Sequence, residues 1–441
     1  MISAQRRSEI VDALRKGTVP VSGLGHLAVG LSRFTAALEE SFAGVEKGAA
    51  AFKAIRGEYG SGKTFFARWM QDQARARGWV TAEVQVSETE TPLHRLETVY
   101  RRLMERLATS DVREGALRSL IDGWFYALEQ DVLADGSVSE QDTDALLVRT
   151  EELMEKRLAE ITRKAPSFSA ALRGYRQAGA RGDRRTADGI LAWLAGQPNV
   201  GASVKHAAGL KGEIDHFGAL SFVEGLLVVL RDSGHPGLLV VLDEVETLQR
   251  VRTDVRDKGL NSLRQLIDEV DGGRFPGLFL AITGTTAFFD GPQGIQRLPP
   301  LAQRLHVDFT TESRFDNPRA IQLRLPGFAR ESLEEVGRRV RDLFAEHTAS
   351  GDRIRTVAND ALVARLAAAV TGELGGKVGV APRIFLKKLV ADLLDRIDQF
   401  PDFDPGEHYQ LTLSDAELTV AERGARGATS PDDIELELPR A

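Results

Sequence analysis

Residues 57–64 read Gly-Glu-Tyr-Gly-Ser-Gly-Lys-Thr, the complete G-x-x-x-x-G-K-T spacing of a phosphate-binding loop. The apolar residues 51–56 before it suit a strand, and residues 63–77 suit a helix whose N-terminus points at an anion. Small residues let backbone N–H groups surround phosphates, while the lysine reaches the β and γ oxygens. The spacing also occurs in ordinary glycine turns. We expect ATP to contact Gly57, Glu58, Tyr59, Gly60, Ser61, Gly62, Lys63, Thr64 and Phe65.

The second half of an ATP site is predicted at residues 238–244, Leu-Leu-Val-Val-Leu-Asp-Glu. Two carboxylates at the end of a buried strand divide the chemistry of hydrolysis between them. Asp243 is expected to hold Mg²⁺ together with the Thr64 hydroxyl, and Glu244 to polarise the attacking water as general base. An isolated Asp-Glu pair could simply cap a strand, but its place after a full phosphate loop favours the catalytic interpretation.

Three further side chains are candidates for contacting the γ-phosphate or the water. The apolar run before Thr283 predicts a strand with threonines at its tip, and we favour Thr283 over Thr285, although threonine is common at strand ends. Arg304 follows a short predicted helix just before a predicted strand, where it would act as a finger on a neighbouring subunit's nucleotide. Arg383 starts a C-terminal helix and would contact the phosphates of its own subunit. Either arginine could instead form a surface ion pair.

Composition limits the class of protein. The 441 residues are 42% hydrophobic and 27% charged, as in a globular chain of two to three domains. The chain has no cysteine, so disulfides and thiolate metal sites are excluded, and its eight histidines are scattered. No signal peptide or membrane span is evident, so we expect a cytoplasmic protein with no membrane partner. A net charge of −7 gives no global attraction to nucleic acid.

The order of apolar runs predicts an α/β fold with a parallel sheet. Residues 237–244 and 277–286 are near-continuous apolar runs, typical of strands buried on both faces. Residues 110–215 show helical periodicity and no strand signal, which indicates a helical insertion. We expect an N-terminal helical segment near the nucleotide base at residues 1–48 and a core in two parts, 49–109 and 216–327, around the insertion at 110–215. A C-terminal helical lid at 328–398 and a loosely packed acidic tail at 399–441 should follow.

The order of these motifs resembles that of the AAA+ P-loop ATPases over about residues 20–398. Within that superfamily, residues 52–70, 86–107, 237–252, 276–305 and 380–389 look like the BrxD ATP-binding proteins of type 2 BREX phage-defence systems. The resemblance implies a bacterial ATPase that acts beside other defence proteins. By motif, it assigns nucleotide contacts to the loop glycines, Lys63 and Thr64, and finger and sensor roles to Arg304 and Arg383. It places the base pocket less sharply, at Val19, Pro20 and Val21.

Three functions are compatible with this chain. The first is an ATP-driven switch or motor assembled as a homo-oligomeric ring or partial ring. The second is a scaffold that ATP stabilises, and the third is a remodeller of proteins without DNA contact. Related initiator ATPases carry a C-terminal winged helix that the acidic residues after 398 do not supply. A DNA contact would have to come from the insertion, where Arg173–Arg185 gathers five arginines around Tyr175. The alternative is a solvated loop.

Overall fold

A parallel five-stranded sheet organises the chain. The computed structural model describes residues 2–136, 138–139, 141–346, 348–373 and 382–410. The strands run in the order β2-β3-β4-β1-β5, and all neighbours are parallel. Their bounds are β1 (Ala51–Arg56), β2 (Val80–Gln85), β3 (Leu238–Asp243), β4 (Leu278–Gly284) and β5 (Gln322–Arg324). This sheet confirms the α/β class expected from the alternating strand and helix patterns.

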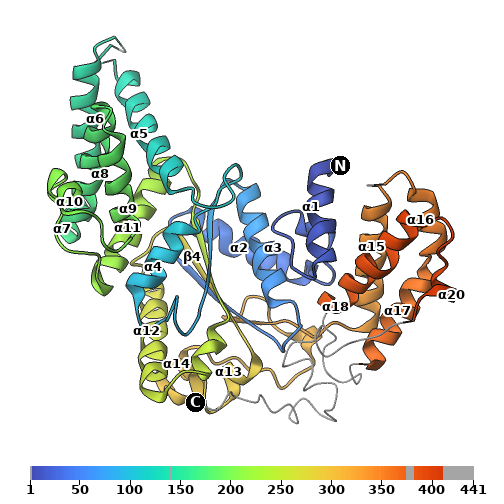
Figure 1. The fold of residues 1–441 in the computed structure, drawn as a ribbon. Helices are drawn as coiled ribbons and strands as arrows, with labels where there is room; N and C mark the ends of the chain where they lie inside the picture. The colour runs from blue at the N-terminus through green and yellow to red at the C-terminus, as the bar shows by residue number, and fades with distance from the viewer. Residues whose placement is uncertain (1, 137, 140, 347, 374–381, 411–441) are drawn as a thin grey trace.

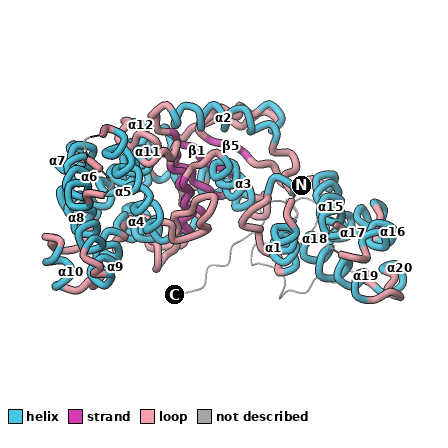
Figure 2. The backbone as a smooth tube through the Cα atoms, turned by 90° about the horizontal axis from the view of Figure 1, so that it is seen from above, coloured by secondary structure: helices cyan, strands magenta, loops and turns pink. Residues whose placement is uncertain are grey.

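Helices cover both faces of the sheet, which is why its central strands are apolar throughout. On β3, Leu239 and Val241 face one layer, whereas Leu238 and Val240 face the other. The first layer holds α2 and α3, and the second holds α4, α11 and α12 (Figure 2). The short helix α13 also belongs to the second layer, through Phe288 and Phe289. The bounds of these helices are α2 (Ser32–Glu46), α3 (Lys63–Ala76), α4 (Leu96–Glu105), α11 (His216–Asp232), α12 (Thr253–Asp271) and α13 (Thr286–Asp290).

Short helices connect several core elements. A 3₁₀ turn precedes α2, another follows β3, and two more lie between α13 and β5 with a short α-helix between them. They are η1 (Leu24–His26), η2 (Val245–Gln249), η3 (Ile295–Arg297), α14 (Pro299–Arg304) and η4 (Ser313–Phe315). The structure differs from the sequence expectation after Arg304, because residues 306–309 form no strand and β5 begins only at Gln322. Only three residues of β5 pair with β1, too few for a periodic signal.

The insertion is helical and projects from one end of the sheet (Figure 1). Its helices are α5 (Leu117–Ala134), α6 (Thr143–Arg157), α7 (Ala159–Lys164), α8 (Pro166–Ala180), α9 (Arg184–Leu194) and α10 (Ala202–Ala207). Phe222 on α11 joins the insertion to the core, because its ring packs edge-on against Tyr100 of α4, Phe168 of α8 and Trp193 of α9, with centroids 5.3–6.0 Å apart. The insertion therefore shares one continuous apolar cluster with the sheet.

A second helical bundle lies at the other end of the molecule (Figure 1). It consists of α15 (Arg330–Ala345), α16 (Gly351–Val357), α17 (Asp360–Glu373), α18 (Pro382–Lys387), the π-helix η5 (Lys388–Leu394), α19 (Asp395–Gln399) and α20 (Pro405–His408). The N-terminal helix α1 (Ala4–Arg15) belongs to the same cluster through Ile10, Val11 and Leu14. The N-terminal segment thus spans from this bundle to α2 on the sheet.

The start of the acidic tail is packed rather than loose. The Arg353 guanidinium donates hydrogen bonds to the carbonyls of Pro401 and Phe403, 2.8 and 3.1 Å away. Phe403 and Tyr409 also pack against the bundle core. Residues 411–441 lie outside the described part of the chain.

Replacing Phe222 by alanine should destabilise the whole protein. The change removes a ring buried among three other aromatic side chains, so the unfolding free energy should fall by about 3–5 kcal/mol. Phe217→Ala on the same helix provides the matched control, because that ring is 73% exposed and its loss should change stability by less than about 0.5 kcal/mol. Urea unfolding followed by circular dichroism measures both. Equal effects of the two variants would contradict the bridging role of Phe222.

Candidate functional site

The phosphate loop has the backbone that its glycines permit. It leaves β1 at Arg56 and enters α3 at Lys63. Gly62 has φ +88°, a left-handed conformation that side chains disfavour. Gly57 lies so close to the chain after β5 that a Cβ there would be 3.1 Å from the Leu325 carbonyl oxygen. Both glycines are therefore required for the loop to wrap at the end of the sheet.

Lys63 is held against its own loop. Its Nζ donates hydrogen bonds to the carbonyl oxygens of Gly57 and Glu58, at 3.0 and 3.1 Å, and lies 5.3 Å from the centroid of the Tyr59 ring. The side chain is buried, and this burial lowers the pKa of the ammonium group, although nearby carboxylates, Glu246 foremost, oppose the shift. A charged side chain in this position is poised to move onto an incoming anion.

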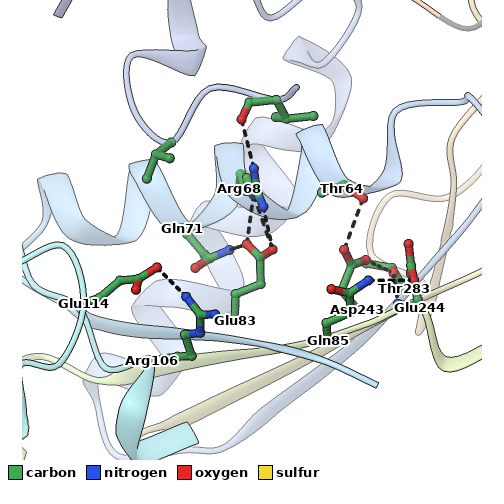
Figure 3. A network of polar contacts seen from close by, with 12 residues as sticks. Thr64, Arg68, Gln71, Glu83, Gln85, Arg106, Glu114, Asp243, Glu244 and Thr283 are labelled. Atoms are coloured by element: carbon green, nitrogen blue, oxygen red, sulfur yellow. Dashed lines mark hydrogen bonds and ion pairs between the residues drawn. The ribbon is translucent and has the colours of Figure 1, made fainter. Parts of the chain in front are cut away.

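The two halves of the predicted ATP site meet at Asp243 (Figure 3). One carboxylate oxygen accepts a hydrogen bond from Thr64 Oγ1 at 3.1 Å, and the other accepts one from the Thr283 hydroxyl. Thr283 is fully buried beneath Asp243 and also accepts the Glu244 N–H at 3.1 Å. Burial raises the pKa of Asp243, while the hydrogen bonds from both threonines lower it. Thr283 thus orients the acidic pair, whereas Thr285 caps α13 through Phe288 N.

Glu244 is exposed and held by a residue that the sequence did not single out. Its backbone has φ +61°, one of the few left-handed non-glycine conformations in the described chain. The Gln85 amide nitrogen donates a hydrogen bond of 2.9 Å to Glu244 Oε2 (Figure 3). Gln85 is the last residue of β2 and pairs in register with Asp243. Because β2 neighbours β3 only in the folded sheet, no local motif identifies it.

A second missed residue is Glu246, in η2 directly after the acidic pair. It is only 4% exposed, and its Oε2 is buried without a hydrogen-bond partner among the described residues. Burial raises its pKa to about 7, although the charge of Lys63 opposes the shift. Glu246 lines the same pocket as Lys63, Asp243 and Glu244. The signal that the sequence offers for Glu246 is its position, two residues after Glu244, the predicted general base.

Lys63, Asp243, Glu244 and Glu246 line a pocket of about 370 Å³, which lies in the range of small-molecule sites. The loop contributes Tyr59, Gly60, Ser61, Gly62, Lys63, Thr64 and Phe65, as expected. Apolar side chains also line the pocket, among them Leu31, Phe34, Phe328, Val336 and Leu386. Arg383, the second residue of α18, also lines the pocket. The hydroxyl oxygen of Ser61 is buried without a partner among the described residues, as a loop built around an anion would require.

Val21 does not line the pocket, contrary to the expectation that it contacts the nucleotide base. Its side chain is 54% exposed, while Val19 and Pro20 line the pocket. The reason is that α3 holds this loop by its backbone, which turns the Val21 side chain to solvent. Arg68 donates to the Val19 carbonyl at 2.9 Å, and Arg75 donates to the Val21 carbonyl at 3.2 Å. Arg68 also binds Glu83 of β2 (Figure 3).

Arg304 lies apart from this pocket, at the end of α14 and beside α12. Its guanidinium forms ion pairs with Asp268 and Asp271, at 3.0 and 2.7 Å. The side chain is about one third exposed, so solvent screens these pairs. The structure therefore brings Arg383 into the subunit's own pocket and leaves Arg304 on another face.

The arginine-rich segment of the insertion also differs from expectation. Tyr175 is buried, and its hydroxyl donates a 2.7 Å hydrogen bond to Asp122, so its ring is not free to stack on a base. Arg173 pairs with Glu155, and Arg176 pairs with Glu129. Local composition could not reveal these acids because they lie on α5 and α6. The exposed arginines of this segment are Arg181, Arg184 and Arg185.

The oxygen ligands at the pocket suit Mg²⁺, a hard cation bound through one or two carboxylates and phosphates. Thr64 Oγ1 and Asp243 Oδ2 are adjacent and lie beside the loop that would hold the phosphates. In the described part of the chain, no cluster of three or more histidine and carboxylate side chains could hold another metal. None of the helices described there combines the length and apolar character that crossing a membrane requires.

Glu246→Gln should stabilise the nucleotide-free protein at high pH. Because the carboxyl pKa rises from 4.5 to about 7 on folding, the folded state binds more protons between these values, and wild-type stability should fall as pH rises through this window. The amide carries no such penalty, so at pH 8 the variant should be more stable by on the order of 1–3 kcal/mol. Near pH 4.5 the difference should vanish.

Urea unfolding between pH 5 and 8 measures this difference. Lys63, Asp243 and Glu244 also face Glu246, but they remain in both proteins. The exposed Glu88→Gln serves as a control with the same change in charge outside the pocket, and it should show no comparable dependence. A stability difference that stays constant with pH would contradict a strained, buried Glu246 carboxylate.

Comparison with known proteins places the chain in a family. A family model described as BREX system ATP-binding protein BrxC/D matches residues 2–413. No curated protein matches the chain. Among solved structures, the Aeropyrum pernix ORC2 protein in its ADPNP and ADP complexes aligns at 12% identity and a TM-score of 0.33, over 82% of this chain and 67% of that one. So loose an alignment locates no site residue.

The expected α/β fold is confirmed, with the phosphate loop at the carboxyl end of β1 in a five-stranded parallel sheet. The family match covers the phosphate loop, the acidic strand, the insertion and the C-terminal bundle through α20. The chain belongs to the BrxC/D family of BREX system ATP-binding proteins.

Proposed function

We propose that this protein hydrolyses ATP with Mg²⁺ and acts as an AAA+ switch or motor in a BREX-type phage-defence system. The observation that carries the proposal is the 3.1 Å contact between Thr64 and Asp243, which joins the phosphate loop to the acidic strand beside one pocket. Family membership supports ATP binding. We further infer a cytoplasmic location and other proteins of the defence system as partners.

The roles of the chain's own residues follow from the geometry. Lys63 would exchange two backbone carbonyls for the β and γ oxygens of ATP. Glu244 would polarise the attacking water once it leaves Gln85. Thr283 is a positioning residue, because its hydroxyl contacts Asp243 and the backbone of Glu244.

Thr64 and Asp243 are the residues that would hold Mg²⁺. When bound, the ion neutralises charge on the β and γ phosphates. The position of Asp243 is fixed by hydrogen bonds to both of its oxygens, so its carboxylate would need little rearrangement.

The two arginines would act on different nucleotides. Arg383 lines the pocket of its own subunit and would sense the phosphates there. Arg304 is on another face and would reach a neighbour's nucleotide in a homo-oligomeric ring or partial ring. Its partners Asp268 and Asp271 would have to release it, and because these ion pairs are partly exposed, their loss should require little free energy.

A second candidate function is the remodelling of protein partners without DNA contact. The burial of Tyr175 and the ion pairs of Arg173 and Arg176 favour it, because they remove three members of the expected DNA-binding cluster. Contact with DNA would then depend on Arg181, Arg184 and Arg185. A salt-dependent DNA affinity that is lost when these three are replaced by alanine would favour the DNA-acting switch.

Lys63→Ala and Glu244→Gln should separate binding from hydrolysis. The first removes the phosphate cation and should abolish ATP binding. The second keeps the pocket but removes the general base, so ATP should bind while turnover falls by at least about 100-fold. Fluorescent-nucleotide titration and steady-state phosphate release over a range of protein concentrations measure both. Wild-type ATP affinity in Lys63→Ala, or unchanged turnover in Glu244→Gln, would refute these assignments. Turnover per subunit that rises with concentration would support assembly.

Mixing two inactive variants should test whether Arg304 acts in trans. Arg304→Ala subunits retain an intact pocket, and Lys63→Ala subunits retain the arginine, so a mixed assembly contains interfaces with both parts. Phosphate release should recover to a measurable fraction of the wild-type rate. Arg314→Ala, an exposed arginine paired with Glu312, should keep its activity unmixed and serves as control. Absence of recovery in assembled mixtures would place Arg304 outside the active site.

A further inference from the structure

We propose that Glu246 is a second water-binding carboxylate of the ATP site, which accepts a hydrogen bond from the water that attacks the γ-phosphate. The inference rests on the proposed ATPase function and adds a residue to its machinery. It starts from the buried, unpartnered Oε2 of Glu246 and from the place of this side chain in the pocket wall.

A buried carboxylate oxygen without a partner is rare, because the lost hydration is seldom left uncompensated. Glu246 is enclosed by the protein, yet it lines a pocket that a ligand can enter. The protein therefore keeps an acceptor ready at this position at a cost to its own stability. Such an arrangement is typical of groups that meet their partner only in the complex.

No described group donates a hydrogen bond to Glu246 Oε2, so we expect its donor to arrive with the nucleotide. Asp243 and Glu244 carry carboxylates, which accept hydrogen bonds when ionised. Lys63 already donates to two carbonyls and is needed by the phosphates. The Tyr59 hydroxyl accepts a 3.3 Å hydrogen bond from Arg250 and donates none to Glu246 Oε2. The phosphate oxygens of ATP are acceptors. Water bound beside the γ-phosphate is therefore the donor that fits a free carboxylate oxygen here.

The arrangement also explains how one pocket uses two glutamates. Glu244 is exposed and hydrogen-bonded to Gln85, so it approaches the water from the solvent side. Glu246 is buried, and its charge acts on both Lys63 and Tyr59. A water held between the two carboxylates would have both hydrogens directed away from phosphorus and a lone pair directed toward it. Fixing the attacking water in this way is a recognised source of rate enhancement in phosphoryl transfer.

The chemical step balances with Glu246 as a hydrogen-bond acceptor only. The water oxygen forms a bond to the γ-phosphorus, and the bond between that phosphorus and the β–γ bridging oxygen breaks, leaving its electron pair on ADP. The proton released by the water passes to Glu244 and then to solvent. Glu246 keeps its charge state throughout and holds the second hydrogen of the water.

The variants Glu246→Gln, Glu246→Asp and Glu88→Gln test this role in the full-length protein. Glu246→Gln keeps the shape of the side chain but removes an acceptor oxygen. Glu246→Asp keeps the carboxylate but shortens the side chain by one methylene. Glu88→Gln changes the same charge outside the pocket. Dissociation constants are measured for ATP, for ADP and for ADP with aluminium fluoride, a mimic of the transferring phosphoryl group with its in-line water. Phosphate release and urea unfolding are followed in parallel.

For Glu246→Gln we expect affinities for ATP and ADP within about threefold of wild type, and affinity for the aluminium fluoride complex weakened at least tenfold, because the contact with the water should be strongest when that water is in line with the transferring group. Where the wild type turns over, kcat should fall by a similar factor while KM changes little. Glu246→Asp should recover part of the loss, and Glu88→Gln should match the wild type.

Two results would overturn the proposal. Equal changes in the affinities for ATP and for the aluminium fluoride complex would make Glu246 a counter-charge to Lys63 or a structural residue. Unchanged values for all three ligands in Glu246→Gln would remove it from the site. Failure of the proposed function looks different, because nucleotide affinity in Lys63→Ala would then equal that of the wild type. The aluminium fluoride measurement needs no turnover, so it decides the role of Glu246 even where hydrolysis awaits a partner.

Discussion

The hydrogen bond between Thr64 and Asp243 depends on the strand order of the sheet. The two residues are 179 positions apart in sequence and meet because β1 and β3 flank β4 and all three run in parallel. Parallel strands bring their carboxyl ends to one edge, so the phosphate loop, the acidic pair and Thr283 are collected there. The insertion leaves this edge intact because it joins the sheet through α4 and α11, on one face only. The chain can therefore carry a large helical addition without disturbing its site.

Burial sets the electrostatics of that edge. Lys63, Asp243 and Glu246 are all removed from water, which lowers the pKa of the amine and raises those of the carboxyls. Burial thus disfavours the ionised form of each group relative to solvent. A bound ATP–Mg²⁺ complex would supply charges of both signs that offset this penalty. These buried charged groups lower the stability of the fold while they prepare the site for binding, a common relation between stability and function.

Sequence predicted the residues whose chemistry is local and missed those defined by neighbours across the fold. The loop at 57–64 and the pair Asp243 and Glu244 have fixed spacings, so their positions in the pocket follow from the chain itself. Gln85 could not be predicted, because its relation to Glu244 exists only through the pairing of β2 with β3. The exposed Val21 and the buried Tyr175 show the converse error. The family resemblance suggested a contact for Val21 and local composition suggested one for Tyr175, but packing against α3 and α5 prevents both.

The segment between α1 and α2 links the pocket to the two bodies on either side of it. At its start, α1 packs into the C-terminal bundle through Leu14, whereas Arg68 and Arg75 of α3 fix the following loop to the sheet. Arg383 approaches the same pocket from the bundle. A nucleotide bound there would touch sheet, segment and bundle together, so a change in its phosphates would alter contacts on both sides of the segment. In the proposed switch, this geometry would provide a physical route from ATP hydrolysis to a change in the angle between sheet and bundle.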